Sequence, residues 1–232
     1  MTSPCPDIRD RLLSAGCVGR TGRQSAKRHI VIHEADCTLP GADAQAHCRY
    51  FEGLCKAGVT ALSYHYVVDS GAIFRLIPDN ECACHAGDGT GPRSANVRGI
   101  GVLLCVNSDA DPAETRARAA ELVAYLMLTH GLDMDAVCQH HDFGGKDCPH
   151  GLRLGGAWKR FMDSCEAALV DMAEQRRRCV DCCACPWYKV QICASRDHEE
   201  ALGLAGELRE KGYMAYVVAD LDYKTLLGQG ET

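Results

Sequence analysis

Short apolar runs alternate with segments of helical periodicity along the first 170 residues. The most continuous run, GIGVLLCVN at residues 99–107, predicts a central buried strand. The other predicted strands span residues 29–33, 62–69, 70–79 and 134–140, and the second and third of these form a hairpin. Helices are predicted over residues 42–58, 111–131 and 154–178. This alternation of strands and helices predicts an α/β domain.

A change of composition after this domain divides the chain into four parts. We expect an N-terminal extension at residues 1–28, the α/β domain at residues 29–170 and a cysteine-rich linker at residues 171–186. In residues 187–232 a strand, a helix and a second strand follow one another, which predicts a small βαβ module.

The composition narrows the function classes. The 232 residues are 47% hydrophobic and carry a formal net charge of −6. No basic face is implied, so we expect no nucleic-acid partner. No run approaches the roughly 18 apolar residues of a membrane-spanning helix, so we expect no membrane insertion. Residues 1–28 lack the apolar core of a secretory signal, which favours synthesis in the cytoplasm without a signal peptide.

Sixteen cysteines suggest either an extracellular disulfide framework or small buried hydrophobic residues. We favour burial, because these cysteines are spread along predicted strands and helices, as at Cys48, Cys55, Cys105 and Cys165. The cluster CVDCCAC at residues 179–185 is interpreted as part of the linker. A further metal or disulfide site is the alternative, although one tetrahedral zinc rarely takes four ligands from so short a stretch.

Candidate chemistry gathers where predicted strands end. His33 and His140 each close an apolar run, and Cys148 follows across the glycine-containing segment HHDFGGKDC, which also carries Lys146. Two imidazoles and a thiolate are good zinc ligands, and three protein ligands leave a fourth position open, as in catalytic zinc sites. The sequence therefore predicts a zinc site at His33, His140 and Cys148.

Neighbouring residues have plainer interpretations. We expect His141 to contact a ligand residue or to lie at the surface, with a ligand role as the alternative. Asp142 either orients a ligand histidine or lies in solvent. Cys82 and Cys84 alternate along a strand and are expected to pack in the core, as is His65.

Four segments resemble type 2 N-acetylmuramoyl-L-alanine amidases, the zinc amidase fold shared with peptidoglycan recognition proteins and phage lysozyme-amidases. They are IVIHEA (30–35), residues 63–89, NVRGIGVLLCVN (96–107) and QHHDFGGKDCPHGLR (139–153). The resemblance implies a mixed central β-sheet flanked by helices. It also implies zinc ligands at His33, His140 and Cys148, catalytic roles for Tyr64 and Lys146, and a position near the substrate for His85. Asn96 and Arg98 precede the central strand and are further candidate substrate contacts.

The implied reaction is hydrolysis of the amide between N-acetylmuramic acid and the L-alanine of the peptidoglycan stem peptide. Zinc lowers the pKa of bound water from 15.7 toward about 7, which supplies hydroxide at neutral pH. Some relatives use a glutamate in the central strand as base, but this chain has Leu103 and Leu104 there, which favours a mechanism through Tyr64 and Lys146.

An endolysin or autolysin that reaches the cell wall after release, by a holin or by cell lysis, is the expected context. The alternatives are a non-catalytic peptidoglycan-recognition protein and a cytosolic amidase that recycles muropeptides. Residues 187–218 resemble one half of a SPOR domain, whose known role is peptidoglycan binding.

Overall fold

A computed structural model describes residues 5–181, residue 199 and residues 203–204 and 206–207. The predicted SPOR-like module, residues 187–232, lies outside the described residues apart from those last positions, and so do Cys182, Cys183 and Cys185 of the cysteine cluster.

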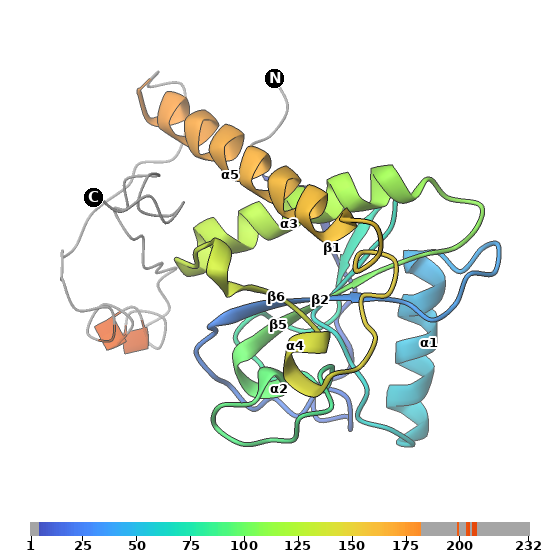
Figure 1. The fold of residues 1–232 in the computed structure, drawn as a ribbon. Helices are drawn as coiled ribbons and strands as arrows, with labels where there is room; N and C mark the ends of the chain where they lie inside the picture. Colours follow the sequence, from blue (N-terminus) through green and yellow to red (C-terminus); the bar gives the residue numbers. More distant parts are fainter. Residues whose placement is uncertain (1–4, 182–198, 200–202, 205, 208–232) are drawn as a thin grey trace.

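Six strands form one mixed sheet in the order β1-β4-β3-β5-β2-β6 (Figure 1). All neighbouring pairs are parallel except β3 and β4, which form the predicted hairpin. The strands are β1 (Ile8–Asp10), β2 (His29–Glu34), β3 (Tyr66–Val68), β4 (Ile73–Arg75), β5 (Gly99–Leu104) and β6 (Val137–Gln139). The mixed central sheet is confirmed.

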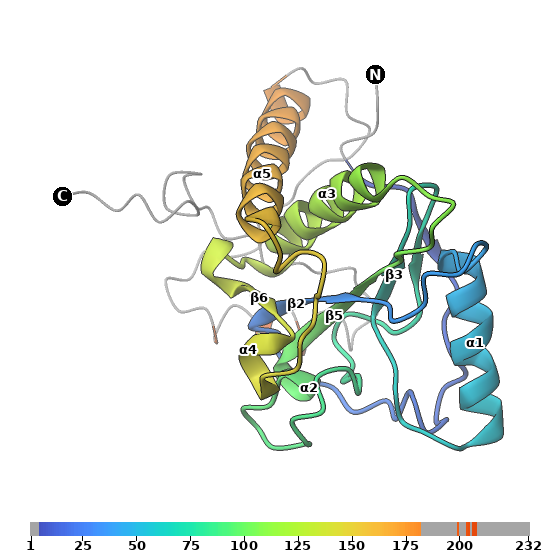
Figure 2. The ribbon, with the colours of Figure 1, turned by 45° about the vertical axis from the view of Figure 1, so that its right-hand side comes forward.

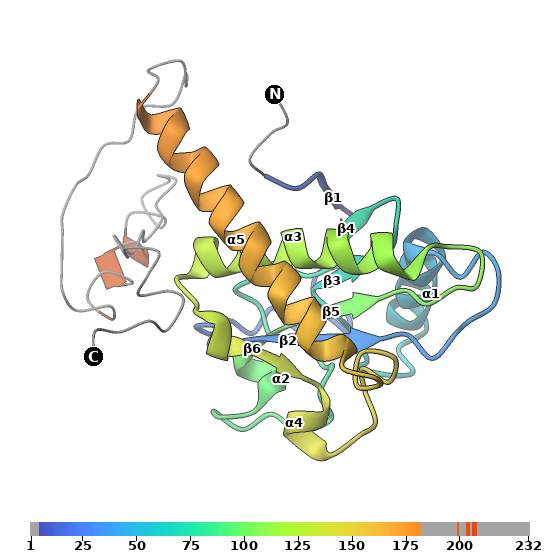
Figure 3. The ribbon, with the colours of Figure 1, turned by 45° about the horizontal axis from the view of Figure 1, so that its top comes forward.

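Helices cover both faces of this sheet, as Figures 2 and 3 show. Helix α3 packs against α5 and against β3 and β5 on one face, whereas α1 packs against β3 and β4 on the other. The helices are α1 (Ala44–Ala57), α2 (Ala95–Arg98), α3 (Pro112–His130), α4 (His141–Gly144), α5 (Ala157–Asp181) and a 3₁₀ turn at Met134–Ala136. The three long helices confirm the predicted ones, and α5 continues into the region predicted as linker.

The ends of the two best-predicted helices have local causes. The Asp43 side chain accepts a hydrogen bond from the Ala46 N–H at the start of α1, and Asp111 caps α3 in the same way. At the other ends, Gly58 and Gly131 adopt φ values of 66° and 63°. This left-handed conformation suits glycine and stops each helix where the sequence predicts.

Alternation along β2 divides its side chains between the two faces. Ile30 and Ile32 are fully buried in the core that α3 and α5 cover. Val31 belongs to a separate cluster with Ala86 and Ala95, and His33, two residues further on, points to the same side. The alternation therefore brings a histidine into the interior on the face opposite the main core.

Residues before His29 also belong to this structure. Strand β1 pairs with β4, and Leu13 is buried in the core beneath α1. A disulfide joins Cys17 to Cys55 of α1, with the two Cα atoms 5.5 Å apart. The predicted burial of Cys55 is confirmed, but its thiol is bonded to Cys17, because the N-terminal segment folds back onto α1. Burial of free thiols is confirmed at Cys48, Cys105 and Cys165.

A buried polar network ties the hairpin to the end of α3. The Tyr66 hydroxyl donates to Asp79 Oδ1 at 2.5 Å, and His130 Nε2 lies 3.0 Å from Asp79 Oδ2. Burial alone would raise the pKa of the Asp79 carboxyl, but the hydrogen bonds from His130 and Tyr66 outweigh it and hold this pKa below its usual value.

Among the helices of the described residues, none combines the length and apolar character that crossing a lipid bilayer requires.

Loss of the disulfide is expected to weaken the fold. Cys17→Ser, or reduction of the Cys17–Cys55 bond, should lower the free energy of unfolding by about 2–4 kcal/mol, because the bond constrains the unfolded chain. Its partners are separated by 38 positions in the sequence. Denaturant unfolding with and without reductant measures the effect. Cys84→Ser, which removes a free thiol, should leave the response to reductant intact, and equal stability of the oxidised and reduced protein would contradict the prediction.

The Asp79 network predicts an acid-sensitive contribution to stability. A carboxyl whose pKa is lower in the folded than in the unfolded state stabilises the fold above the unfolded pKa, and this contribution is lost as the pH falls through the folded pKa. Asp79→Asn should therefore cost about 1.5–3 kcal/mol at pH 7 and progressively less in acid. Urea unfolding at a series of pH values tests this. Asp163→Asn, on the exposed surface of α5, is the control and should shift stability by less than about 0.5 kcal/mol at every pH.

Candidate metal centre

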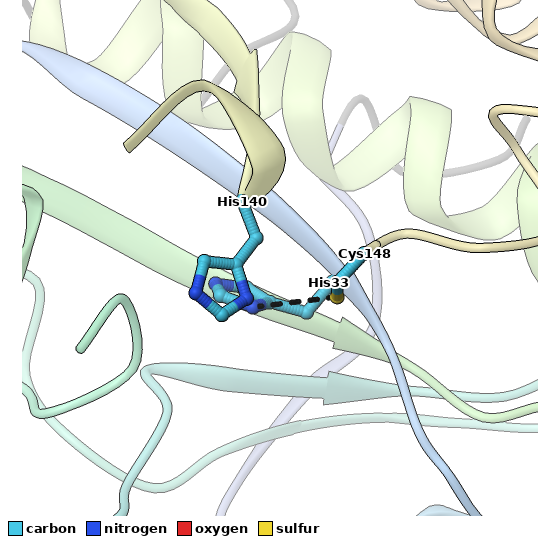
Figure 4. Close-up of side chains that lie close together, drawn as sticks. All are labelled: His33, His140 and Cys148. Atoms are coloured by element: carbon cyan, nitrogen blue, oxygen red, sulfur yellow. Dashed lines mark hydrogen bonds between the residues drawn. The ribbon is translucent and has the colours of Figure 1, made fainter. Parts of the chain in front are cut away.

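Three buried side chains meet at one edge of the sheet. One potential ligand atom from each of His33, His140 and Cys148 lies within 4.8 Å of the other two, and Figure 4 shows the three side chains converging. Within the part of the chain that the structure describes, this is the one such group. The structure thus brings together the three residues that the sequence predicts as ligands.

Each ligand is delivered by a different element. His33 is the penultimate residue of β2. His140 directly follows β6, and its backbone N–H donates to the Ile32 carbonyl at 3.1 Å, which keeps it level with His33. Cys148 returns after α4 and the turn at Gly145, where φ is 71°, and its carbonyl accepts from the His141 N–H at 2.8 Å.

The free donor atoms fit a zinc ion. His140 Nε2 lies 3.1 Å from the Ala86 carbonyl, which can only accept, so the ring proton is on Nε2 and Nδ1 carries a lone pair. That Nδ1 atom is buried and has no hydrogen-bond partner among the described residues. His33 Nδ1 lies 3.9 Å from Cys148 Sγ. Two imidazole nitrogens and one sulfur form a donor set that zinc accepts in catalytic sites.

Burial sets the charge states of this group. It lowers the pKa of His33 well below its usual value and lowers that of His140, so both rings are neutral, which is the form that binds metals. Burial raises the pKa of the Cys148 thiol, whereas the backbone of Glu34 and the positive charge of Lys146 oppose this rise. A bound cation would act in the same direction as Lys146 and favour the thiolate.

His85 and Asn96 lie behind the ligands rather than in an open cleft. His85 is only 3% exposed, and its Nδ1 is 3.0 Å from His33 Nε2. Burial and the charge of Lys27 lower the pKa of His85 to about 3. The carbonyls of Gly99 and Ala95 favour protonation and oppose part of this decrease. Asn96 is 4% exposed, and its Oδ1 accepts from the backbone N–H groups of His85 and Ala86.

A pocket of about 460 Å³ opens beside Cys148. Apolar and aromatic side chains form much of its wall, including Phe51, Tyr64 and Leu103. Its polar lining comes from Glu34, Asp36, Cys37, His47, Tyr50 and Lys146. An apolar pocket with a few polar groups is the usual form of a small-molecule site.

The two predicted catalytic residues both line this pocket. The Tyr64 ring packs edge-on against His33, with ring centroids 5.0 Å apart, and burial raises the pKa of its hydroxyl above the usual value. The Lys146 side chain is 58% exposed, and its Nζ lies 3.6 Å from Asp36 Oδ2. The predicted substrate contacts His85, Asn96 and Arg98 are not among the residues that line the pocket, and Arg98 donates from Nε to the Pro92 carbonyl at 2.6 Å.

Sequence reasoning missed several pocket residues. Glu34 and Asp36 follow the candidate ligand His33 closely in the sequence. Their position at the end of a strand could have indicated that they line the site. Tyr50 is an exposed aromatic residue on α1, and exposed aromatic residues often mark binding surfaces.

The neighbouring residues that the sequence analysis considered lie outside the group of His33, His140 and Cys148. His141 Nδ1 lies 3.0 Å from the Lys146 carbonyl, and Asp142 Oδ2 accepts from the Gln139 N–H at 2.8 Å, so both shape the loop. His65 is confirmed as a core histidine, with its ring between the Gly101 N–H and the Glu81 carbonyl. Cys82 and Cys84 are only partly buried, because they lie in a loop rather than in a core strand.

Residues 23–151 match the family model described as N-acetylmuramoyl-L-alanine amidase. Among curated proteins, the amidase XlyA of Bacillus subtilis is 36% identical over 149 residues, which are 64% of this chain and 48% of that protein. The amidase CwlH of the same organism is 32% identical over 144 residues, or 62% of this chain and 55% of that protein. The chain thus spans about half the length of these relatives.

Two solved structures share both fold and sequence with the chain. The catalytic domain of XlyA has a TM-score of 0.63 and 34% identity, and the match covers 68% of this chain and 99% of that one. A mutant endolysin from Bacillus subtilis gives a TM-score of 0.63 and 34% identity, with 69% and 99% coverage.

Proposed function

The chain belongs to the N-acetylmuramoyl-L-alanine amidase family, and we propose that it hydrolyses the amide bond between N-acetylmuramic acid and L-alanine in peptidoglycan. The observation that carries this proposal is the complete group of His33, His140 and Cys148 beside a pocket of about 460 Å³. A non-catalytic recognition protein would have no need of three convergent ligands with a lone pair left free on His140 Nδ1.

Zinc is the cofactor that we propose for this group. His33, His140 and Cys148 would hold the ion, and the fourth position would remain open because no fourth candidate ligand joins them among the described residues. When bound, zinc supplies Lewis-acid chemistry that activates water near neutral pH and polarises a carbonyl group.

Lys146 is the proposed electrostatic stabiliser. It lines the pocket beside Cys148, and its charge acts on His33, His140 and Cys148 together. Hydrolysis of an amide places negative charge on the carbonyl oxygen in the transition state, and a cation within reach lowers that barrier. The exposed Lys146 ammonium can meet this oxygen from the solvent side of the pocket.

Tyr64 is the proposed orienting residue. Its ring packs on His33 and lines the pocket, and its hydroxyl can both donate and accept hydrogen bonds. The residue paired with His33 across the sheet is Leu103, which carries no ionisable group. We therefore assign the positioning of the attacking water and substrate to Tyr64 rather than to a carboxylate in β5.

The bacterial cell wall is the proposed partner. A matching structure is described as an endolysin, and the curated relatives are described as N-acetylmuramoyl-L-alanine amidases. We propose that this chain likewise acts on wall peptidoglycan, after release from the cell in which it is made.

Digestion of purified peptidoglycan tests the reaction directly. Mass spectrometry should find new free L-alanine amino termini, which disappear when a chelator removes the metal and return when zinc is added. His33→Ala, His140→Ala and Cys148→Ser should each abolish both stoichiometric zinc and cleavage, because each leaves two protein ligands. His150→Ala, at an exposed histidine two residues beyond Cys148, should retain both. Folded, zinc-loaded protein that binds peptidoglycan without producing these termini would refute the proposal in favour of recognition alone.

Lys146→Met separates catalysis from metal binding. We expect kcat to fall by about 10²–10³, the usual loss for one oxyanion-stabilising donor, while zinc content stays at one per chain. Steady-state kinetics on a soluble muropeptide, together with metal analysis, measure the two quantities. Lys159→Met on α5, which removes an equally charged and exposed side chain, is the matched control. A parallel loss of zinc in Lys146→Met would argue that the residue acts on the metal site and not on the transition state.

A further inference from the structure

The His85–Ala86 dipeptide contacts the Nε2 atoms of both candidate ligand histidines, His33 and His140. His33 Nε2 lies 3.0 Å from His85 Nδ1, and His140 Nε2 lies 3.1 Å from the carbonyl of the next residue, Ala86. The two histidines come from different strands, β2 and the end of β6. The His85–Ala86 dipeptide therefore sets the orientation of both rings.

The Asn96 side chain fixes this dipeptide in turn. Its Oδ1 accepts from the His85 N–H at 2.8 Å and from the Ala86 N–H at 2.7 Å, and its Nδ2 donates to the Gly89 carbonyl at 2.9 Å. All the usual hydrogen-bonding atoms of the Asn96 amide are thus engaged by the backbone of the loop. A buried amide engaged in this way has little capacity left for a substrate.

The backbone of β5 leaves room for the His85 ring. A Cβ atom at Gly101 would lie 2.6 Å from His85 Cγ, and one at Gly99 would lie 3.2 Å from His85 Cε1. The ring therefore packs directly on glycine backbone. His65, which directly precedes β3, accepts from the Gly101 N–H at 2.9 Å and holds that backbone in place. These contacts restrict the His85 ring to the position from which its Nδ1 reaches His33.

We propose that His85 and Asn96 are positioning residues that make both ligand histidines present Nδ1 to the metal. The inference rests on the metal site proposed above and gives these two residues a role distinct from substrate contact. With His85 Nδ1 as acceptor, the proton of neutral His33 resides on Nε2 and the lone pair on Nδ1, the atom that faces Cys148 Sγ. The Ala86 carbonyl selects the same tautomer in His140. Partners of this kind typically change metal affinity by about 10–100-fold.

Substitution of His85 by asparagine or by glutamine tests whether His85 Nδ1 accepts a hydrogen bond from His33. In His85→Asn the side-chain oxygen can occupy the place of Nδ1, whereas in His85→Gln the longer side chain carries its amide toward the place of Nε2. We expect His85→Gln to weaken zinc binding about 10–100-fold and His85→Asn to restore most of it. Competition with a chromophoric chelator, without peptidoglycan, measures the affinity. The absorption spectrum of the cobalt-substituted protein should be altered in His85→Gln and close to that of the unchanged protein in His85→Asn.

A second pair tests Asn96. Asn96→Asp keeps an oxygen acceptor for the His85 and Ala86 N–H groups, whereas Asn96→Leu removes it. Zinc affinity should fall in Asn96→Leu and be largely retained in Asn96→Asp. Thermal unfolding of the metal-free variants separates a general loss of stability from a specific loss of metal binding. His150→Gln serves as the surface control for all four variants.

The outcomes distinguish this inference from the proposed function. Equal zinc affinity and equal cobalt spectra in His85→Asn and His85→Gln would overturn the inference while leaving the amidase intact. A raised KM on muropeptides with unchanged metal affinity would instead make His85 and Asn96 substrate contacts. The expected pattern of zinc affinities in a protein that cleaves no peptidoglycan would support the positioning roles and refute only the proposed activity.

Discussion

The parallel pairing of β2 with β5 on one side and with β6 on the other is the constraint on which the site depends. It places His33 opposite Leu103, and it carries His140 one residue beyond the Gln139 that pairs with Ile32. Because parallel strands require long crossover connections, residues more than a hundred positions apart arrive at the same sheet edge. Helix α3 lies in the crossover from β5 to β6 and covers the far face, so the connection that builds the site also builds the main core.

That arrangement puts polar rings in the interior, where each must find a partner. His33, His65 and His85 are all nearly or fully buried, and burial lowers the pKa of each. Neutral rings avoid the cost of a buried charge, and hydrogen bonds to one another or to the backbone offset the cost of a buried polar group. Two buried ring nitrogens of the described residues, His85 Nε2 and His140 Nδ1, have no hydrogen-bond partner, and the second is the atom that a metal would engage. One of the buried polar atoms without a hydrogen-bond partner thus belongs to the candidate metal site.

The sequence predicts the ligand set but not what holds it. His33 and His140 can be predicted because each lies at the end of a strand whose apolar pattern is strong. Cys148 can be predicted because it lies in a charged, glycine-containing loop, where the pattern suggests no packing role for a thiol. The partner of Cys55 could not be predicted, since pairing depends on a 5.5 Å approach that only the folded N-terminal segment creates. Strand β1 has three residues and no apolar alternation. The places of His85 and Asn96 depend on hydrogen bonds across a glycine-rich loop without periodicity, so the sequence shows neither their burial nor their partners.

The site combines buried side chains with exposed ones. His33 is fully buried and has a contact on each ring nitrogen, so it cannot change orientation without disturbing β2 and β5. Among the described residues, Lys146 forms an ion pair with Asp36, across 3.6 Å, and the two side chains are 58% and 90% exposed. Such a surface ion pair contributes about 0–1 kcal/mol, so a substrate oxygen that gains negative charge can replace Asp36 at little cost. Phe51 and Leu103 belong to the apolar wall of the pocket, and a charge beside apolar side chains is screened less than one in bulk water. In the proposed mechanism, the buried candidate ligands would set where the reaction occurs, and the exposed lysine would meet the charge that develops there.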